Sequence, residues 1–301
     1  MKLSLAGGVV GVLVVVNAAA FVAVEQHFQV ATGQVAAGPS SAQPAAADVG
    51  ASSPSANVPA KSTTPPVVAH LGAPSVVVTA VNATRAWRAA NSGGCAGSVQ
   101  VQATKDGGVT WTTLAASPAG TADGIGIDGN GHLQLSGQAA NGCTHNVWTL
   151  DTGAWSASTS PASWAPAGAQ SPDVIHNGHR AKACDAGSVI DLAVAGDTAD
   201  VLCSTGAVRA VPAGGAAKTI YQSADALSIG TTKDNSLVVA QTEEGCDGVE
   251  LATVSGGSAK KITCVQGASK AVDLTFAGNH GWLVAAHNTW TGGTSGDWSK
   301  S

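Results

Sequence analysis

Short runs of alternating apolar and polar residues fill the chain from about residue 75 to its end. Ser98-Val99-Gln100-Val101-Gln102 is one such run, and Gly124-Ile125-Gly126-Ile127 pairs with a second run that starts at His132. Gly, Asn and Asp bound these runs. A period of two predicts strands with one buried face, whereas helices would repeat apolar residues at every third or fourth position. The pattern therefore predicts an all-β domain.

The strand pairs recur as units. A cysteine marks the same place in four of them: Cys95, Cys143, Cys203 and Cys246. These landmarks are about 40 to 60 residues apart, close to the length of four short strands and their turns in one propeller blade. A fifth unit, from Thr289 to Trp298, lacks the cysteine but keeps a Gly-rich turn and a Trp. We expect a small β-propeller of about five four-stranded blades, with a β-sandwich pair or an incomplete β-solenoid as the alternatives.

One turn carries a more specific pattern, Thr104-Lys105-Asp106-Gly107-Gly108-Val109-Thr110-Trp111. The Thr and Asp side chains can bond the backbone of their own turn, and glycine supplies positive φ. The segment resembles the Asp-box, or BNR, repeat of sialidases and related propellers, and Thr149–Trp155 is a shorter, imperfect copy. The resemblance implies a sialidase-like superfamily propeller in which these turns lie far from the ligand. The residues it makes structural are Thr104, Asp106, Gly108, Trp111, Asp151, Gly153 and Trp155.

Residues 1–30 contain no charged side chain between Leu3 and Val24. A helix of that length is about 33 Å long, close to the hydrocarbon thickness of a bilayer. We expect a single-pass anchor in the cell membrane, with Lys2 on the cytoplasmic side and the remaining chain outside. A cleaved signal peptide ending near Ala18-Ala19-Ala20 is the alternative, and it would make the protein secreted.

Residues 31–74 hold more than half of the prolines and are otherwise rich in Ala, Ser and Gly, with Asp48 and Lys61 as their only charged side chains. Such a composition predicts a disordered linker, because it offers too little apolar surface to offset the entropy of ordering. The propeller is therefore expected to occupy residues 75–301. Because the chain ends soon after Trp298, we expect the outer strand of the last blade to come from Ala73–Val78.

Six cysteines fall in the outward domain, and an even number there predicts disulfides. The strand order of a propeller suggests Cys184–Cys203 and Cys246–Cys264, each pair at one end of a blade, with Cys264 following the last strand of the next unit. Cys95–Cys143 would then join two consecutive blades. A metal site is the alternative, but no Cys-x-x-Cys spacing supports it, so neither a metal nor a cofactor is expected.

Charge excludes some functions. The net charge is -5 with only four arginines, which gives no basic stripe for nucleic acid. A sialidase needs an arginine cluster and a Tyr nucleophile, whereas this chain has a single tyrosine, Tyr221, and no Arg motif at its first strand. Other glycosidases need two facing carboxylates. Four acids in loops of the expected ligand face could supply them: Asp185, Glu243, Glu244 and Asp247.

Ligand binding is the preferred interpretation. We expect the ligand on the cysteine-bearing face, where Ser156–Ala183 would form a long connection carrying His176 and His179. Further candidates for binding are His145, His287 and Trp290. Together these features predict a membrane-anchored, extracytoplasmic, non-catalytic recognition or scaffold module for a protein or a cell-envelope glycan. A glycoside hydrolase of the Asp-box superfamily is the alternative.

Overall fold

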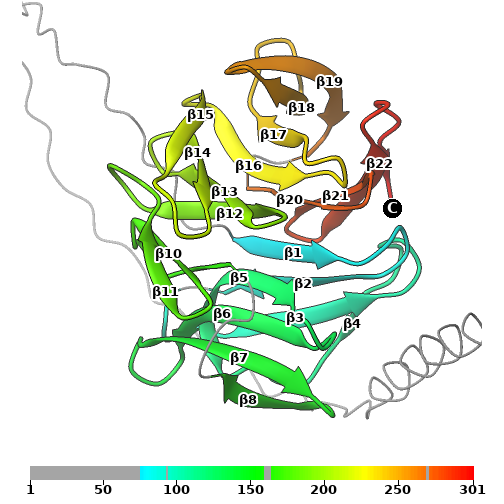
Figure 1. The fold of residues 1–301 in the computed structure, drawn as a ribbon. Coiled ribbons are helices and arrows are strands. Elements are labelled where there is room, and N and C mark those ends of the chain that lie inside the picture. Colours follow the sequence, from blue (N-terminus) through cyan, green and yellow to red (C-terminus); the bar gives the residue numbers. More distant parts are fainter. Residues whose placement is uncertain (1–74, 93, 159–163, 269–270) are drawn as a thin grey trace, which may run out of the picture.

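The computed structural model describes residues 75–301 except 93, 159–163 and 269–270. Its regular elements are all strands, grouped into six antiparallel sheets (Figure 1). Five sheets have four strands and one has three. Innermost strands of neighbouring sheets contact one another, and the first sheet contacts the last. The chain is therefore a six-bladed β-propeller, so the predicted fold class is confirmed and the predicted number of five blades is wrong.

The first three blades run in chain order. The first comprises β1 (Val76–Ala80), β2 (Ala86–Asn91), β3 (Val99–Thr104) and β4 (Thr112–Thr113). The second comprises β5 (Ala119–Ile127), β6 (Leu133–Ala139), β7 (His145–Asp151) and β8 (Ala154–Ser158). The third comprises β9 (Ala165–Pro166), β10 (Asp173–His176) and β11 (His179–Lys182).

The last three blades each have four strands. The fourth comprises β12 (Val189–Ala195), β13 (Thr198–Cys203), β14 (Ala207–Pro212) and β15 (Lys218–Gln222). The fifth comprises β16 (Ala226–Thr231), β17 (Leu237–Gln241), β18 (Gly248–Ser255) and β19 (Ser258–Gln266). The sixth comprises β20 (Asp273–Ala277), β21 (His280–Ala285), β22 (Asn288–Gly293) and β23 (Ser299–Lys300).

Antiparallel order gives the ring two faces. In a four-stranded blade, the turns after the first and third strands lie on one face, which we call the hairpin face. The loop after the second strand and the connection to the next blade lie on the other, the cysteine face, because all three disulfides are there. Cys95–Cys143 joins the first two blades, whereas Cys184–Cys203 and Cys246–Cys264 have Cα–Cα distances of 5.8 and 5.7 Å. Cys264 lies within β19 of the same blade as Cys246, not after the next unit.

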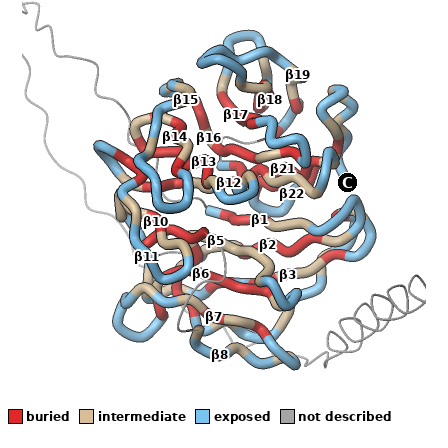
Figure 2. The backbone as a smooth tube through the Cα atoms, in the orientation of Figure 1, coloured by how far each residue is buried: buried red, intermediate tan, exposed pale blue. Residues whose placement is uncertain are grey.

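The core lies between the blades. Buried apolar residues form clusters that span the first and second, third and fourth, fourth and fifth, and fifth and sixth blades. Figure 2 shows the buried residues concentrated in the strands and the turns mostly exposed. Each pair of blades thus buries the apolar faces that the period-two pattern predicted.

The third blade corrects the interpretation of Ser156–Ala183 as a connection. Its strands are only two to four residues long, which is too short for the alternation to stand out. The loop between β9 and β10 meets the start of β12, where the Val189 amide donates to the Ser171 carbonyl. That loop therefore lies on the cysteine face, and the turn between β10 and β11 lies on the hairpin face.

The ring closes without strand exchange, contrary to the expectation for Ala73–Val78. β1 is the innermost strand of the first blade, and β23 supplies the outer strand of the sixth. Side chains close the joint instead. Trp111 of the first blade packs edge-on against Trp282 of the sixth, 6.4 Å between ring centroids, and the Trp282 indole N–H donates to the Asn82 carbonyl at 3.1 Å. Gly108 has a φ of 91°, and a Cβ there would lie 2.8 Å from Thr289.

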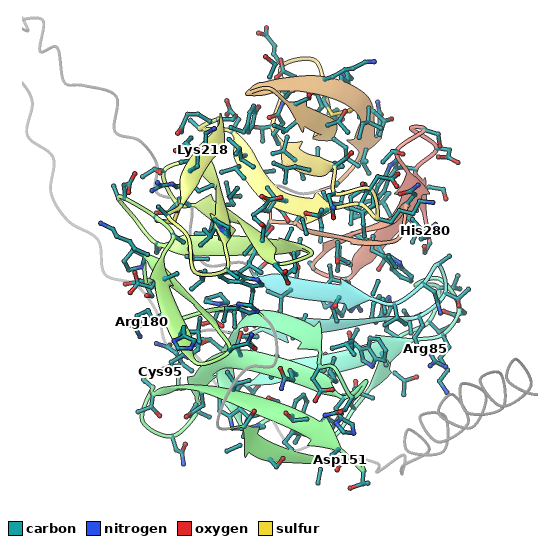
Figure 3. The ribbon with its side chains drawn as sticks, viewed as in Figure 1. Arg85, Cys95, Asp151, Arg180, Lys218 and His280 are labelled. Atoms are coloured by element: carbon teal, nitrogen blue, oxygen red, sulfur yellow. A yellow bond between two sulfur atoms is a disulfide. The ribbon has the colours of Figure 1, made fainter. Side chains whose placement is uncertain are left out.

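The turn between β3 and β4 is held by its own side chains. The Thr104 hydroxyl accepts from the Gly108 amide at 3.1 Å and donates to Asp106 at 2.8 Å. The Asp106 carboxylate accepts from the Thr110 amide at 2.9 Å and from the Thr110 hydroxyl. These bonds, led by the Thr110 hydroxyl, lower the pKa of Asp106 to about 2. The turn between β7 and β8 has no such carboxylate clasp, and Asp151 lies exposed at its edge (Figure 3).

Among the described residues, no helix is long and apolar enough to cross a bilayer. The predicted anchor in residues 1–30 and the predicted linker in residues 31–74 lie outside the described part of the chain.

The substitution Asp106→Ala should lower the melting temperature at neutral pH, because three donors of the turn lose their acceptor. A carboxyl whose pKa is lowered by folding contributes stability at pH values above its pKa in the unfolded chain. The difference in melting temperature between the variant and the unsubstituted chain should therefore narrow as the pH falls from about 4 to about 2. Differential scanning calorimetry measures it, with the exposed neighbour Lys105→Ala as control. Equal melting temperatures for Asp106→Ala and the parent at neutral pH would contradict a structural role for the turn.

Candidate functional site

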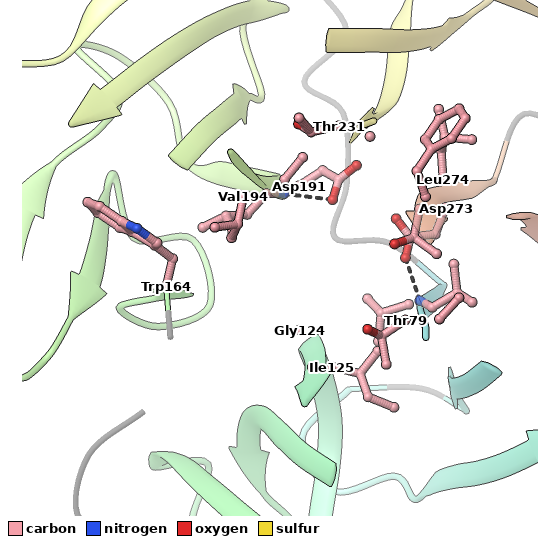
Figure 4. Close-up of a pocket in the computed structure, with 18 of the residues that line it drawn as sticks. Thr79, Gly124, Ile125, Trp164, Asp191, Val194, Thr231, Asp273 and Leu274 are labelled. Carbon is pink, nitrogen blue, oxygen red and sulfur yellow. Dashed lines mark hydrogen bonds between the residues drawn. The ribbon is translucent and has the colours of Figure 1, made fainter. Parts of the chain in front are cut away.

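A cavity of about 360 Å³ occupies the centre of the ring. Residues of β1, β5, β12, β16 and β20 line it, together with Trp164, which immediately precedes β9 (Figure 4). The contributions of β5, β12 and β16 come from their later residues, so the cavity lies toward the hairpin face. Its volume falls in the range of roughly 300–1,000 Å³ that is usual for small-ligand sites.

Three polar side chains join the innermost strands around this cavity. The Val78 amide of the first blade donates to Asp273 of the sixth. In the same way, the Leu274 amide donates to the Ser228 hydroxyl of the fifth blade at 2.8 Å. In both cases a backbone N–H of an innermost strand donates to a side chain of the preceding blade.

The fourth blade completes this pattern. The Ile229 amide donates to Asp191 at 2.7 Å, and the other Asp191 oxygen accepts from the Leu192 amide. The Ser228 hydroxyl contacts both acids, donating to Asp191 and lying 3.1 Å from the second oxygen of Asp273. We call Asp191, Ser228 and Asp273 the polar belt.

Irregular pairing places two members of the polar belt. The register between β12 and β13 shifts between Val189 and Asp191, and that between β16 and β17 shifts between Ala226 and Ser228. Such β-bulges insert one residue and re-aim the next side chain. A third shift, between Ala122 and Gly124 of β5, falls on Asp123, which also lines the cavity.

Burial shapes the chemistry of the polar belt. Loss of solvation raises the pKa of Asp191 to about 6, against the opposing hydrogen bonds from Ser228 and Ile229. The pKa of Asp273 is raised well above its usual value, first by burial and then by the charge of Asp191. The two carboxyls titrate as a pair, and a protonated Asp273 carboxyl can donate to Ser228 while Ser228 donates to Asp191.

The histidine candidates are not brought together. His145 starts β7 at its cysteine-face end, with its Nε2 3.1 Å from the Asp123 carboxylate, and His287 is exposed on the cysteine face between β21 and β22. His176 and His179 flank the hairpin of the third blade, on the opposite face from the one expected. His176 stacks on Trp164 with a centroid distance of 4.4 Å. Trp290 belongs to the buried core of the fifth and sixth blades.

The carboxylates predicted for catalysis do not line the central cavity. Asp185 is exposed, and its contact with Arg209, 2.6 Å from oxygen to nitrogen, lowers its pKa. Glu243, Glu244 and Asp247 are exposed in the loop between β17 and β18, where they line a separate open groove on the cysteine face. The four acids thus lie in loops of the cysteine face, as expected, but away from the central cavity, and a catalytic role for them stays an untested prediction.

The acids that do meet at the axis were missed. Asp191 and Asp273 each stand inside an apolar run, Ile190-Asp191-Leu192 and Val272-Asp273-Leu274, and Ser228 stands between Leu227 and Ile229. A lone polar residue at the same place in three inner strands was the available signal. In the described part of the chain, no group of three or more His, Cys, Asp or Glu side chains is placed to hold a metal ion.

The chain matches no protein-family model and no curated protein. Among solved structures, it resembles the Aleuria aurantia lectin in complex with Fucα1-6GlcNAc, with a TM-score of 0.50 and 10% identity, covering 76% of this chain and 94% of that chain. YCF48 bound to D1 peptide gives 0.40 and 13%, with 76% and 82% covered. A putative 6-phosphogluconolactonase from Bacteroides fragilis gives 0.46 and 12%, with 75% and 82% covered. At these identities the likeness shows the propeller fold alone.

Raised carboxyl pKa values make the folded chain bind protons more tightly than the unfolded chain. The stability they contribute is complete below about pH 4 and is lost as the pH rises, through about 6 for Asp191. Asp273→Asn mimics the protonated carboxyl, so it should leave the free energy of unfolding unchanged at acid pH and raise it at alkaline pH, where the parent loses this contribution. Urea unfolding across this range measures the effect, and the exposed Asp197→Asn is the control. Parallel stability curves for Asp273→Asn and the parent would contradict the protonated state of Asp273.

Proposed function

We propose that the propeller is a non-catalytic recognition module that holds a segment of a protein or of a cell-envelope glycan in its central cavity. One observation carries this proposal: the cavity is already formed and polar, but the carboxylates at its wall are engaged. Asp191 and Asp273 hold neighbouring blades together, and Asp123 contacts Ser136 and His145 of its own blade. Both oxygens of Asp191 and both of Asp273 have hydrogen-bond partners, either Ser228 or a backbone amide. A general acid or a nucleophile needs a free oxygen within reach of its substrate.

The lining of the cavity suits a ligand rich in hydroxyl or amide groups. Thr79, Thr231 and Thr275 contribute hydroxyls from three different blades. Trp164 and Phe276 contribute ring surface on which a sugar or a peptide side chain can lie. A glycan is one class to test, since the lectin of similar fold is described with a fucosylated disaccharide.

The wider proposal places this module outside the cell. The three disulfides indicate an extracytoplasmic domain. The uncharged run from Leu3 to Val24 supports a membrane anchor, with residues 31–74 as the linker. The clasped turn at Thr104–Trp111 supports membership of the Asp-box group of propellers. His145 and His287 stay candidates for contacts on the cysteine face.

A glycoside hydrolase is the second candidate, because two carboxyl groups with raised pKa values meet at the cavity. Retaining glycosidases hold their two carboxyl groups about 5–5.5 Å apart. Asp191 and Asp273 both lie within hydrogen-bonding distance of Ser228. Catalysis by this pair would require the ligand to displace partners of the polar belt.

The full-length chain should be retained on an array of cell-envelope and host glycans or on a peptide array, with no release of reducing sugar. Val194 lines the cavity and is 46% exposed, so Val194→Arg should obstruct the cavity without unfolding the ring. Retention should fall at least about tenfold, the equivalent of roughly 1.4 kcal/mol. The matched control is Val109→Arg, because Val109 is 68% exposed on a turn of the first blade that does not line the cavity.

Equal loss in both arginine variants, or no retention on either array, would overturn the cavity as the binding site. Release of reducing sugar that disappears in Asp191→Asn would establish the hydrolase instead.

A further inference from the structure

A second hollow lies between the fourth and fifth blades, on the hairpin face. It is an open groove of about 700 Å³, separate from the central cavity. Ile220, Leu237 and Val254 give it apolar surface, and Thr198, Ser236 and Ser255 bring hydroxyl groups. Asp200 of β13 is the single charged residue among the described residues that line it.

Asp200 is buried and unpaired. It is 6% exposed, and no described residue offers its carboxyl a hydrogen bond or an ion pair. Successive side chains of β13 point to opposite faces of the sheet, which fixes the direction of the Asp200 side chain. Val201 packs between the third and fourth blades, whereas Leu202 packs between the fourth and fifth. Asp200 therefore faces the fifth blade and the groove.

The charged side chains of the neighbouring strands are engaged elsewhere or exposed. Arg209 of β14 contacts Asp185 and the Ala217 carbonyl. Glu250 of β18 is paired with Lys261 of β19 at 3.0 Å. The remaining charged residues of the flanking turns and outer strands are exposed: Asp197, Lys218, Lys233, Asp234 and Lys260 (Lys218 is labelled in Figure 3).

An unpaired carboxylate in such a place is costly, because burial removes water without supplying a counter-charge. Loss of solvation alone raises the pKa of Asp200 to about 6. The fold could have placed an apolar residue at this position, as it does with Leu202 two residues later. A ligand that brings a positive charge would offset the cost.

We propose that this groove binds an alkylammonium group, with the ammonium against Asp200 and the methylene chain along Ile220, Leu237 and Val254. A compact ammonium needs one carboxylate and further oxygen acceptors, which the hydroxyl groups provide. A guanidinium prefers a bidentate carboxylate in its plane, and a divalent cation needs more acidic ligands than one. A lysine side chain and a free aliphatic diamine both carry such an alkylammonium group.

The test uses the full-length chain and three probes: Nα-acetyl-lysine amide, cadaverine, and Nα-acetyl-norleucine amide, which lacks the ammonium. At about pH 8 the two amines should bind with a Kd on the order of 1 mM, whereas the norleucine compound should not bind. Near pH 5 only about a tenth of Asp200 is ionised, so affinity should fall about tenfold. Isothermal titration calorimetry at the two pH values measures the affinity of each probe and its change with pH.

Asp200→Asn should abolish amine binding while keeping the melting temperature of the parent at acid pH. The matched control is Asp234→Asn, which removes an exposed negative charge beside the groove and should leave binding unchanged. If Asp200→Asn fails to fold, carboxyl carbon NMR of the unsubstituted chain decides, because saturating cadaverine should lower the pKa of Asp200 toward its usual value.

Binding of both amines supports the shared chemistry, binding of the lysine compound alone identifies a protein ligand, and binding of cadaverine alone identifies a small molecule. The proposal is overturned if neither amine binds, if the norleucine compound binds equally well, or if the pKa of Asp200 does not move. These outcomes are independent of the central cavity, since Val194→Arg leaves the groove lining intact.

Discussion

From the fourth blade round to the first, the ring is held at its axis by backbone amides that donate to a side chain of the preceding blade. Apolar packing between blades has no direction and fixes no angle, whereas a hydrogen bond to a buried acceptor does. The contact of the Val78 amide with Asp273 matters most, because it joins the two ends of the domain where no strand is shared. Trp111, Trp282 and Gly108 complete that joint at the hairpin face.

Local pattern was enough to predict the β-propeller, because period-two alternation and turn residues act over a few positions. The cysteine pairs proposed from strand order are the pairs that the structure brings to bonding distance. The third blade escaped prediction because β9 has two residues and β10 and β11 have four each, so no alternation can build up. Strand exchange was wrong because β23 already occupies the outer edge of the sixth blade.

The candidate site was harder to predict than the fold. Exposed acids in loops, such as Glu243 and Glu244, draw attention in a sequence, yet they lie away from the axis. Asp191 and Asp273 sit within apolar runs where a strand interior is expected, and only their shared position across blades reveals them. Burial alone does not give an acid its role, since Asp273 has partners for both oxygens whereas Asp200 has none among the described residues.

The third blade also makes the ring uneven. Because β9 has only two residues, β5 of the second blade and β12 of the fourth blade contact each other directly beside it. Among the more extensive contacts of the described chain, no other innermost strands of non-neighbouring blades meet in this way. Trp164 fills the same sector. A molecule entering an even ring could sit in several equivalent rotations, each equally populated. Here one sector differs from the others, so the proposed ligand of the central cavity would meet a lining that distinguishes one orientation from the rest.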